Sequence, residues 1–572
     1  MHRRSWFSIA MLAVGLSLLV AAGPASSSSS KAAKANSGAL KKGGTLRVDL
    51  PVTDIDDIDP SLAYGTTTWH IEYSTALKLL TYPDAAAPRG SRLVPEGASS
   101  YRVSNGGRTY TFTIRPGFKF SNGGAVKAAN YAFAINRALG KDLQSPAFQF
   151  VADENATNIV GAEAVRAGTA TKAAGVKVRG NKLSITLTKP DATFLAKISM
   201  PFFQAMPTNL SRTDKVINVD SGHPLPSAGP YYVSERVPNR LVTLKKNPNY
   251  AKAVRNFKKR PAYLSQVNIK TTVNLEASYQ EVQANQADYT YDIPPTAPAE
   301  LGRQYGTKKG RFRVATSNCV SYIAMNSGGA GSGAALFRNN PSLRRAVNYA
   351  INRNAMVGLS GAYAGVPTDQ YLPKGFPGYK ELGAKGYPNT SNMSRARQLA
   401  QGHTKSGAWK YYYGLASPGP QRMELVRSYL SQLGINIDPQ GFRGFAIYDA
   451  AGKRDSPHAF TTGGWCQDYS DPYDFINVLL YGGSIQAENN NNLAYFNNSA
   501  YNTRMEKAAK LIGAKRLAAY SKLENDLVTK QGPWASWTQP TNQFFFSNRV
   551  NPKSLTYQSI YEAYPYNMTA LK

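Results

Sequence analysis

The most informative stretch of this chain is Gly463-Gly464-Trp465-Cys466-Gln467-Asp468-Tyr469-Ser470-Asp471-Pro472, which lies between a predicted strand over 459–462 and a predicted helix over 473–481. A loop that joins a strand to a helix in this way presents an aromatic ring, a thiol and a carboxylate at one mouth. A carboxylate beside a Trp ring is a suitable receptor for a cation such as a free amino terminus. The same residues are equally consistent with a plain surface loop in which Ser470 or Asp471 caps the helix.

Length, composition and charge indicate a folded protein with more than one lobe and a cationic surface. The chain has 572 residues, of which 42% are hydrophobic, and this is too long for one compact core. The formal net charge is +32, and the basic residues are dispersed along the chain. We therefore expect attraction to an anionic wall, membrane or ligand. No motif that combines base stacking with basic residues accompanies this charge, so no nucleic-acid partner is expected.

The N-terminus predicts export. His2-Arg3-Arg4 supplies positive charge, the apolar run 9–20 is too short to span a bilayer, and small residues follow up to Ala25. We assign 1–25 as an export signal and the Ser-, Ala- and Lys-rich segment 26–42 as a flexible leader. No Cys lies near the cleavage region to accept a lipid anchor. The expected location is the cell surface, the cell wall or a periplasm.

The cysteine count is informative in an exported chain. The sequence contains 2 cysteines, Cys319 and Cys466. An even count outside the cytoplasm suggests a disulfide bridge. Each cysteine ends or interrupts a β-rich segment, and neighbouring strands would bring the two within bridging range. Two unpaired buried thiols are the alternative.

Strands and helices alternate along the chain, which is typical of an α/β fold. Alternating apolar and polar residues predict a hairpin over 99–115, with a Gly-rich turn in its middle. Helical periodicity predicts helices over 66–80 and 128–139. It also predicts a single long helix over 342–359, which begins after Asn339-Asn340-Pro341.

Several segments occur together in a specific order and spacing. They are Leu93-Val94-Pro95-Glu96-Gly97-Ala98, 110–123, Ser227-Ala228-Gly229-Pro230-Tyr231, Lys246-Asn247-Pro248-Asn249-Tyr250, 344–353, 423–437 and 465–472. This order resembles the large extracytoplasmic solute-binding proteins of peptide ABC importers, the dipeptide/oligopeptide-binding family 5. The resemblance covers the chain from about residue 43 to its C-terminus.

The resemblance implies an α/β, two-lobed fold of the periplasmic-binding-protein type II, with an extra subdomain in the N-terminal lobe. Lobe I is then discontinuous and the extra subdomain is inserted into it. The implied boundaries are 43–75, 208–317 and 534–572 for lobe I, 76–207 for the inserted subdomain and 318–533 for lobe II. A peptide held between the lobes as an added strand would pair through its backbone, without its side chains being recognised.

The resemblance also implies a ligand-binding set. In such proteins an Asp at the position of Asp468 binds the α-amino group of the peptide, with Gly464 and Trp465 beside it and Trp465 stacked near the first peptide residue. Relatives carry a disulfide at the positions of Cys319 and Cys466, which would hold this loop.

Three positions depart from the pattern of some relatives. Tyr64 offers a hydroxyl and a ring near a place where they have an acidic residue. Phe442 is the loosely matching candidate for an aromatic residue that precedes the Trp loop. Thr462 stands where some relatives have an Arg for the other end of the peptide, which puts ligand length in doubt.

Catalysis is not expected. The chain has no Gly-x-Ser-x-Gly elbow, no His-Glu-x-x-His motif and no phosphate-binding loop, and its histidines are isolated. The acidic run Asp54, Asp56, Asp57 and Asp59 lacks the glycine and distal Glu of a calcium loop, so we predict a solvated turn. No enzyme activity, cofactor or metal site is predicted.

The function predicted from the sequence is an extracytoplasmic, monomeric receptor that captures peptides and delivers them to an ABC permease with its ATPase subunits. Two alternatives stay open at this point. The same fold could bind a non-peptide solute such as an opine, an oligosaccharide or a metal chelate. The chain could instead be a wall-associated signalling or binding protein without a transport role, retained by its positive charge on anionic polymers.

Overall fold

Strands and helices alternate along the chain in a mixed α/β fold, as predicted. A computed structural model describes residues 40–52, 55–86, 89–152, 158–214, 217–271, 273–291 and 293–572. The predicted export signal and nearly all of the predicted leader lie outside these residues. Within them, no helix has the length and apolar character needed to cross a membrane.

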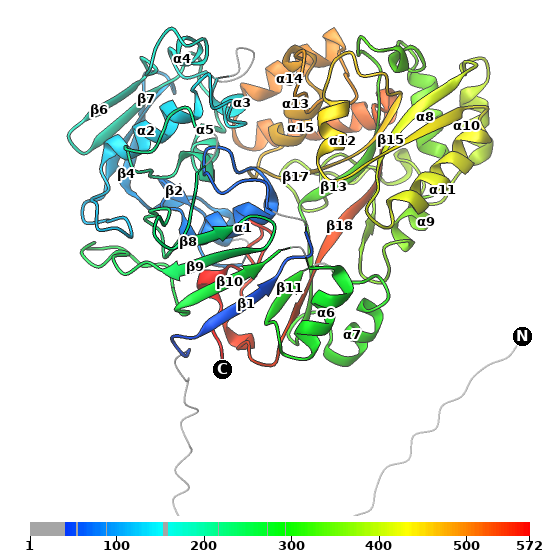
Figure 1. Cartoon of the computed structure of the whole chain (residues 1–572). Helices are drawn as coiled ribbons and strands as arrows, with labels where there is room; N and C mark the ends of the chain where they lie inside the picture. The colour runs from blue at the N-terminus through cyan, green and yellow to red at the C-terminus, as the bar shows by residue number, and fades with distance from the viewer. Residues whose placement is uncertain are drawn as a thin grey trace, which may run out of the picture. The chain divides into compact units, whose positions relative to one another are not determined.

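One large mixed sheet runs through the described part of the chain. Its strands, in spatial order, are β16 (Asn436–Phe442), β15 (Ala408–Gly414), β17 (Phe460–Cys466), β13 (Cys319–Met325), β18 (Trp534–Phe546), β11 (Tyr289–Tyr291), β1 (Thr45–Asp49), β10 (Gln266–Lys270), β9 (Leu241–Lys246) and β8 (Tyr231–Val237), while β12 (Phe312–Thr316) and β14 (Gly365–Pro367) also pair with β18. The long strand β18 pairs with β13 through its first half and with β11 and β12 through its second half. It therefore joins the two halves of the sheet (Figure 1).

A separate four-stranded antiparallel sheet lies inside the predicted inserted subdomain. It has the order β4 (Ala98–Ser104), β5 (Thr109–Ile114), β7 (Lys182–Thr186) and β6 (Val176–Arg179). The predicted hairpin over 99–115 is thus confirmed as β4 and β5. The two-residue strands β2 (Leu80–Thr81) and β3 (Val94–Pro95) pair nearby. The proposed lobe boundaries themselves stay predictions.

Helices pack against these sheets. They are α1 (Thr66–Thr75), α2 (Ala128–Ala138), α3 (Phe148–Val151), α4 (Ala162–Arg166), α5 (Phe194–Lys197), α6 (Leu275–Gln283), α7 (Pro298–Tyr305), α8 (Pro341–Ala350), α9 (Arg353–Gly358), α10 (Met393–Ala400), α11 (Gly419–Ser431), α12 (Ala446–Ala451), α13 (Tyr473–Leu480), α14 (Ser499–Ala509) and α15 (Gly513–Asp526). The predicted helix over 128–139 is confirmed as α2, whereas the helix predicted over 66–80 ends at Thr75.

The prediction of a single helix over 342–359 is wrong. The structure breaks it into α8 and α9 because Ile351 adopts an extended conformation and Asn352 starts a new helix by accepting a hydrogen bond from the backbone of Ala355 at 3.0 Å. Asn favours such a cap because its side-chain oxygen replaces a missing backbone acceptor. The predicted start is confirmed, since Asn340 caps α8 through the backbone of Leu343 at 3.1 Å.

The predicted disulfide is confirmed. β13 and β17 run antiparallel with Cys319 directly opposite Cys466, and the two Cα atoms lie 4.0 Å apart. The cysteines are 147 residues apart in the chain, so the bond closes a large loop. It holds β17 and β13 together at the point where the loop that contains Asp468 leaves the sheet.

Removing this bond should destabilise the folded protein through the entropy of the closed loop. A Cys319→Ala, Cys466→Ala double variant is expected to lose up to about 5 kcal/mol of unfolding free energy. Urea denaturation followed by tryptophan fluorescence measures this loss. Adding a reductant should destabilise the wild type in the same way and leave the variant unchanged. Equal denaturation midpoints for all samples would contradict the prediction.

Candidate functional site

The predicted site begins inside a strand rather than in a loop. β17 extends to Cys466, so Gly464, Trp465 and Cys466 have strand geometry and the loop starts only at Gln467. The Trp465 ring is partly buried against the core of the half-sheet that contains β13. Its indole N–H is buried without a hydrogen-bond acceptor among the described residues.

Asp468 is buried, with only 9% of its surface exposed. The hydroxyl of Tyr64 donates a hydrogen bond to Oδ2 of Asp468 at 2.9 Å, although the two residues are 404 positions apart. The backbone N–H of Asp468 donates to Oδ2 of Asp474 at 2.8 Å. The structure therefore brings together two of the predicted site residues, Asp468 and Tyr64, and adds Asp474, which begins helix α13 with Tyr473.

The acidic run before α1 positions Tyr64. Oδ2 of Asp56 accepts the backbone N–H of Tyr64 at 2.5 Å and that of Gly65 at 2.6 Å. Asp59 is fully buried and binds the guanidinium of Arg137 through both carboxylate oxygens, at 2.6 and 2.5 Å. The predicted solvated turn is therefore wrong for Asp59, because a cation distant in sequence neutralises it in the core. Asp54 lies outside the described residues.

Asp468 and Asp474 form a buried carboxyl pair. Asp474 accepts the backbone N–H of Asp468, and burial raises the pKa of Asp468 to about 7. Burial, and then the charge of Asp468, raises the pKa of Asp474 well above its usual range. Two carboxyl groups in contact favour sharing a proton, since both cannot ionise at low cost. The pKa of the Tyr64 hydroxyl is raised by burial and by Asp468, so Tyr64 stays a donor.

Nearby cations are already paired with other acids. Arg516 binds Asp471 at 2.8 Å, and Lys197 binds Asp191 at 3.0 Å. Neither Asp468 nor Asp474 forms a salt bridge with a described residue. The pair is thus a buried acidic site whose cost is not offset by a positive charge of the protein.

The same segment concentrates buried polar atoms that lack a partner. Besides the Trp465 indole, Oε1 of Gln467 and the hydroxyl of Tyr469 make no hydrogen bond to a described residue. Buried polar groups are almost always satisfied in folded proteins. Such a group of unsatisfied atoms next to a buried acid makes this segment a candidate site for a polar ligand.

A cavity of about 550 Å³ adjoins this segment. Its volume falls within the roughly 300–1,000 Å³ of ligand sites. The lining combines aromatic rings, amides and two cations from two distant parts of the chain. These residues are Phe148, Gln149, Phe150, Ala152, Glu163, Arg166, Ala167, Lys197, Tyr469, Tyr473, Asn477, Val478, Tyr481, Gly483, Ser484, Ile485, Gln486, Asn489, Asn490 and Asn491.

Direct contacts connect the cavity with the acidic site. Gln149, which lines the cavity, lies with its amide nitrogen 3.5 Å from the hydroxyl of Tyr64 and accepts a hydrogen bond from Asn491 at 2.7 Å. The rings of Phe150 and Tyr469 meet edge to face with centroids 6.4 Å apart. Residues near 150 and residues near 470–490 thus enclose the cavity between them.

The remaining predicted residues lie apart from this centre. Phe442 ends the edge strand β16, where its ring packs on Tyr412 at 4.8 Å, and it does not line the cavity described above. Its role in ligand binding stays a prediction. The hydroxyl of Thr462 is hydrogen bonded to that of Tyr411 at 2.9 Å.

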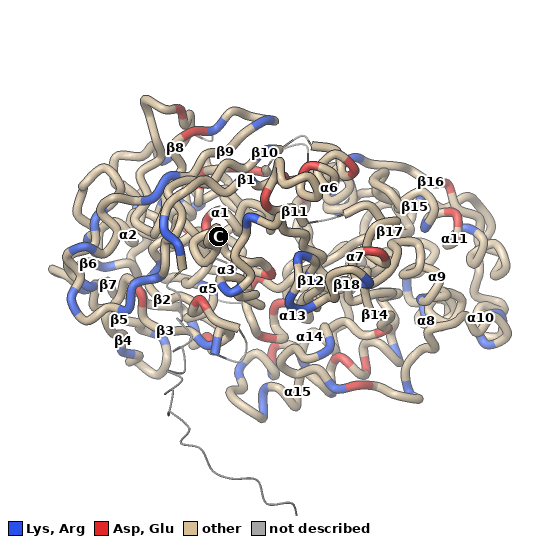
Figure 2. Tube along the Cα trace, turned by 90° about the horizontal axis from the view of Figure 1, so that it is seen from below, with Lys and Arg blue, Asp and Glu red and all other residues tan. Residues whose placement is uncertain are grey.

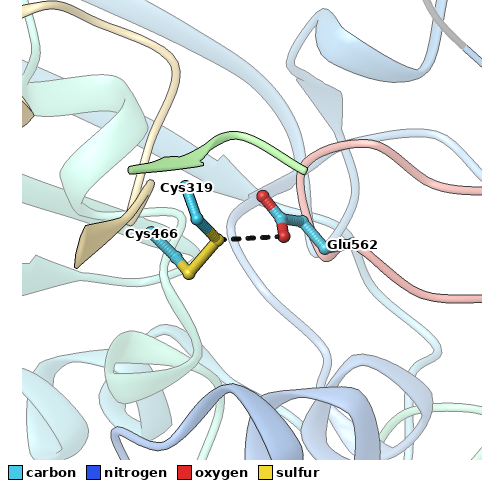
Figure 3. Close-up of side chains that lie close together, drawn as sticks. All are labelled: Cys319, Cys466 and Glu562. Atoms are coloured by element: carbon cyan, nitrogen blue, oxygen red, sulfur yellow. Dashed lines mark hydrogen bonds between the residues drawn. A yellow bond between two sulfur atoms is a disulfide. The ribbon is translucent and has the colours of Figure 1, made fainter. Parts of the chain in front are cut away.

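The disulfide has an acidic neighbour. Figure 3 shows the Glu562 side chain directed at the sulfur atoms, with Oε2 3.3 Å from Sγ of Cys319. Burial raises the pKa of Glu562 to about 7. Oε1 of Glu562 also accepts the backbone N–H of Asn318 at 2.5 Å. Because the two sulfurs are bonded to each other, this group is a structural contact at the start of β13 rather than a set of metal ligands.

Comparison with known families identifies the chain. The family model described as bacterial extracellular solute-binding proteins, family 5 Middle, matches residues 92–487. The chain belongs to this family. Family 5 consists of binding proteins that act outside the cytoplasm.

Individual family 5 relatives are distant in sequence but match over most of their length. The chain is 25% identical to heme-binding protein A of Haemophilus influenzae over 77% of this chain and 78% of that protein. It is 23% identical to the oligopeptide-binding protein OppA of Bacillus subtilis over 67% of this chain and 68% of that protein.

Solved structures share the fold. Clavulanic acid biosynthesis oligopeptide binding protein 2 superposes with a TM-score of 0.80 at 19% identity, covering 93% of this chain and 96% of that one. Haemophilus influenzae OppA in complex with the peptide RPPGFSPFR superposes with a TM-score of 0.74 at 17% identity, covering 93% of this chain and 100% of that one. These matches confirm the predicted family 5 fold.

Sequence analysis missed Asp474, a partner of Asp468, and Gln149, which lies next to Tyr64. Asp474 follows Asp468 by six positions, and its place at the start of α13 is a signal that could have been noticed, because acidic residues favour helix N-termini. Gln149 reaches the site only through tertiary contacts, and no local pattern marks it.

The carboxyl pair predicts how stability depends on pH. The folded-state pKa of Asp468, about 7, lies above its unfolded value near 4, so its contribution is fully present below pH 4 and lost as the pH rises towards 7. Asp468→Asn should remove this loss, which amounts to roughly 4 kcal/mol at most. Relative to wild type, the variant is expected to gain stability between about pH 5 and pH 8, measured by urea denaturation at each pH.

A matched control tests whether the effect is specific. Asp449 is an exposed acid, and Asp449→Asn should leave the pH dependence of the wild type unchanged. If Asp468→Asn and Asp449→Asn follow the same curve, the buried pair does not hold a proton in the folded protein.

Proposed function

We propose that this chain captures peptides between its two lobes and delivers them to an ABC permease. Family membership supports a receptor role, and relatives named as oligopeptide-binding proteins support peptide as the ligand. The observation that carries the proposal is a buried Asp468 carboxyl group that no cation of the described chain neutralises, beside a cavity of about 550 Å³.

The α-ammonium of a peptide supplies the missing charge. It would bind the Asp468 carboxylate on the side not occupied by the Tyr64 hydroxyl. The proton that Asp468 shares with Asp474 would then stay on Asp474 or leave to solvent. Removing one partner of a buried charge pair is costly, because the other partner is left uncompensated. The amine is therefore the group through which the receptor selects peptides.

The unsatisfied groups around Asp468 suit a peptide backbone. The Trp465 indole donates, Oε1 of Gln467 accepts, and the Tyr469 hydroxyl can do either. Backbone carbonyl and N–H groups of an extended peptide offer both kinds of partner at regular intervals. Recognition of this kind uses no side-chain chemistry, so we infer that peptides of varied sequence bind.

The proposed lobes place the two sides of the site on separate parts of the chain. Tyr64 belongs to proposed lobe I (43–75, 208–317, 534–572), the cavity residues near 150 belong to the inserted subdomain (76–207), and Asp468 belongs to lobe II (318–533). Closure of the lobes on a peptide would then form the surface that the permease and its ATPase subunits recognise.

Calorimetry tests the role of Asp468. A mixture of short peptides is titrated into the wild type, Asp468→Asn and the surface control Asp449→Asn. Loss of the buried charge partner should weaken binding by about 3 kcal/mol or more, which is roughly a hundredfold, while the control binds as wild type. N-acetylation of the mixture should weaken binding to the wild type by a similar factor.

Two results would contradict the proposal in different ways. If acetylated and free peptides bind equally well, Asp468 does not hold the amine. If neither mixture binds and mass spectrometry of the purified protein detects a copurifying non-peptide solute, the fold serves another cargo.

A further inference from the structure

Long segments of the chain contain no acidic residue although the chain is rich in Lys and Arg. Neither Asp nor Glu occurs in 97–141, in 164–190 or in 236–275, whereas basic residues recur throughout all three. The chain as a whole contains 35 acidic residues, so their absence from three such long segments calls for a structural explanation.

The structure brings these three segments together on one side of the molecule. β5 from the first segment pairs with β7 from the second, with Thr113 opposite Lys182. The chain that follows β5 contacts the third segment, where Arg115 donates to the carbonyl of Asn256 at 3.4 Å and the ring of Phe118 meets that of Phe257 at 5.1 Å. Figure 2 shows Lys and Arg in the tube around β5, β6 and β7.

The four-stranded sheet has one apolar and one polar face. Its inner face packs on α2 through buried side chains such as Phe112, Leu183 and Ile185. The strand registers place every other residue on the opposite face. We call this the cationic sheet face, and it consists of Ser100, Arg102, Ser104, Thr109, Thr111, Thr113, Lys177, Arg179, Lys182, Ser184 and Thr186.

The cationic sheet face carries hydroxyl groups and positive charges and nothing else. Hydroxyls of neighbouring strands form lateral pairs, Thr109 with Thr186 at 3.3 Å and Thr111 with Ser184 at 3.0 Å. None of the residues of this face is acidic and none is apolar. A surface of this composition attracts anions, offers hydrogen bonds to oxygen-rich groups and has no apolar side chain to insert into a bilayer.

The four cations of this face are available for a partner. Arg102, Lys177, Arg179 and Lys182 are exposed. Within the described parts of the chain, none of them takes part in a salt bridge, unlike the buried Arg137, which binds Asp59 at 2.5 Å. Their charges therefore act on whatever approaches the sheet.

We propose that the cationic sheet face binds a phosphodiester-linked polyol polymer of the cell envelope. The charges would pair with successive phosphates while the rows of Ser and Thr hydroxyls hydrogen bond to phosphate and polyol oxygens. A polymer fits better than a small anion, because the four cations are spread over β4, β6 and β7 rather than gathered around one point. The face lies on the side of the sheet opposite α2, so a bound polymer leaves the cavity free.

Binding to lipid-free poly(glycerol phosphate) tests this proposal with the full-length protein. The site variant combines Arg102→Gln, Lys177→Gln, Arg179→Gln and Lys182→Gln. Its dissociation constant, measured by biolayer interferometry at about 50 mM salt, should rise at least about tenfold. The slope of log Kd against log salt concentration should fall by roughly 3, as expected for the loss of four phosphate contacts.

A matched control removes the same charge elsewhere. Lys380, Lys385, Lys453 and Lys515 are exposed, and replacing all four by Gln should change the dissociation constant by no more than about twofold. Unchanged thermal unfolding and unchanged peptide binding show that both variants are folded, and they separate a failure of this proposal from a failure of the peptide-receptor proposal.

Three results would overturn the inference. The first is equal weakening by the site and control variants, which would indicate attraction by net charge alone. The second is equal affinity for neutral dextran, which would show that phosphate is not recognised. The third is tighter binding to vesicles of phosphatidylglycerol or to double-stranded DNA, lost in the site variant, which would assign the face to a different partner.

Discussion

Strand β18 is the element on which the rest of the architecture depends. Its backbone hydrogen bonds pass from β13 to β11 and β12, so the two half-sheets share one continuous ladder. Buried backbone groups must be paired, and separating the halves would leave those of β18 without partners. Stacking of Trp534 on Tyr322, with centroids 3.9 Å apart, adds to this joint. The loop that contains Asp468 follows β17, which pairs with β13 on the side away from β18.

The buried acidic pair is costly for the fold. Burying Asp468 and Asp474 together without a cation opposes folding, and a shared proton reduces that cost. Arg137 neutralises the buried Asp59, whereas Glu72 and Glu524 are buried with raised pKa values and no salt bridge to a described residue. The Asp468 pair differs from these other acids in its connection to the cavity through Tyr64 and Gln149, and for this reason we propose that a ligand supplies its counter-charge.

Local patterns predicted the elements that local forces determine. The hairpin of β4 and β5 and the helix α2 follow from period and turn chemistry, and both formed close to the predicted bounds. The break between α8 and α9 was not predicted, because the helical spacing of apolar residues continues past Asn352. The Asn352 side chain caps α9 and so starts a new helix there. The burial of Asp59 was missed because its partner lies 78 residues away.

The sequence by itself determined the family, the α/β class and the disulfide partners, since each of these depends on motifs or on the number of cysteines, and it predicted Asp468 as the acidic centre. Only the tertiary structure decided which groups surround Asp468. Tyr64 reaches it across 404 residues, Gln149 contacts Tyr64 in turn, and the cavity exists only where the two chain regions meet. The cationic sheet face likewise required strand registers, because the side of a sheet that a residue faces depends on its pairing partners.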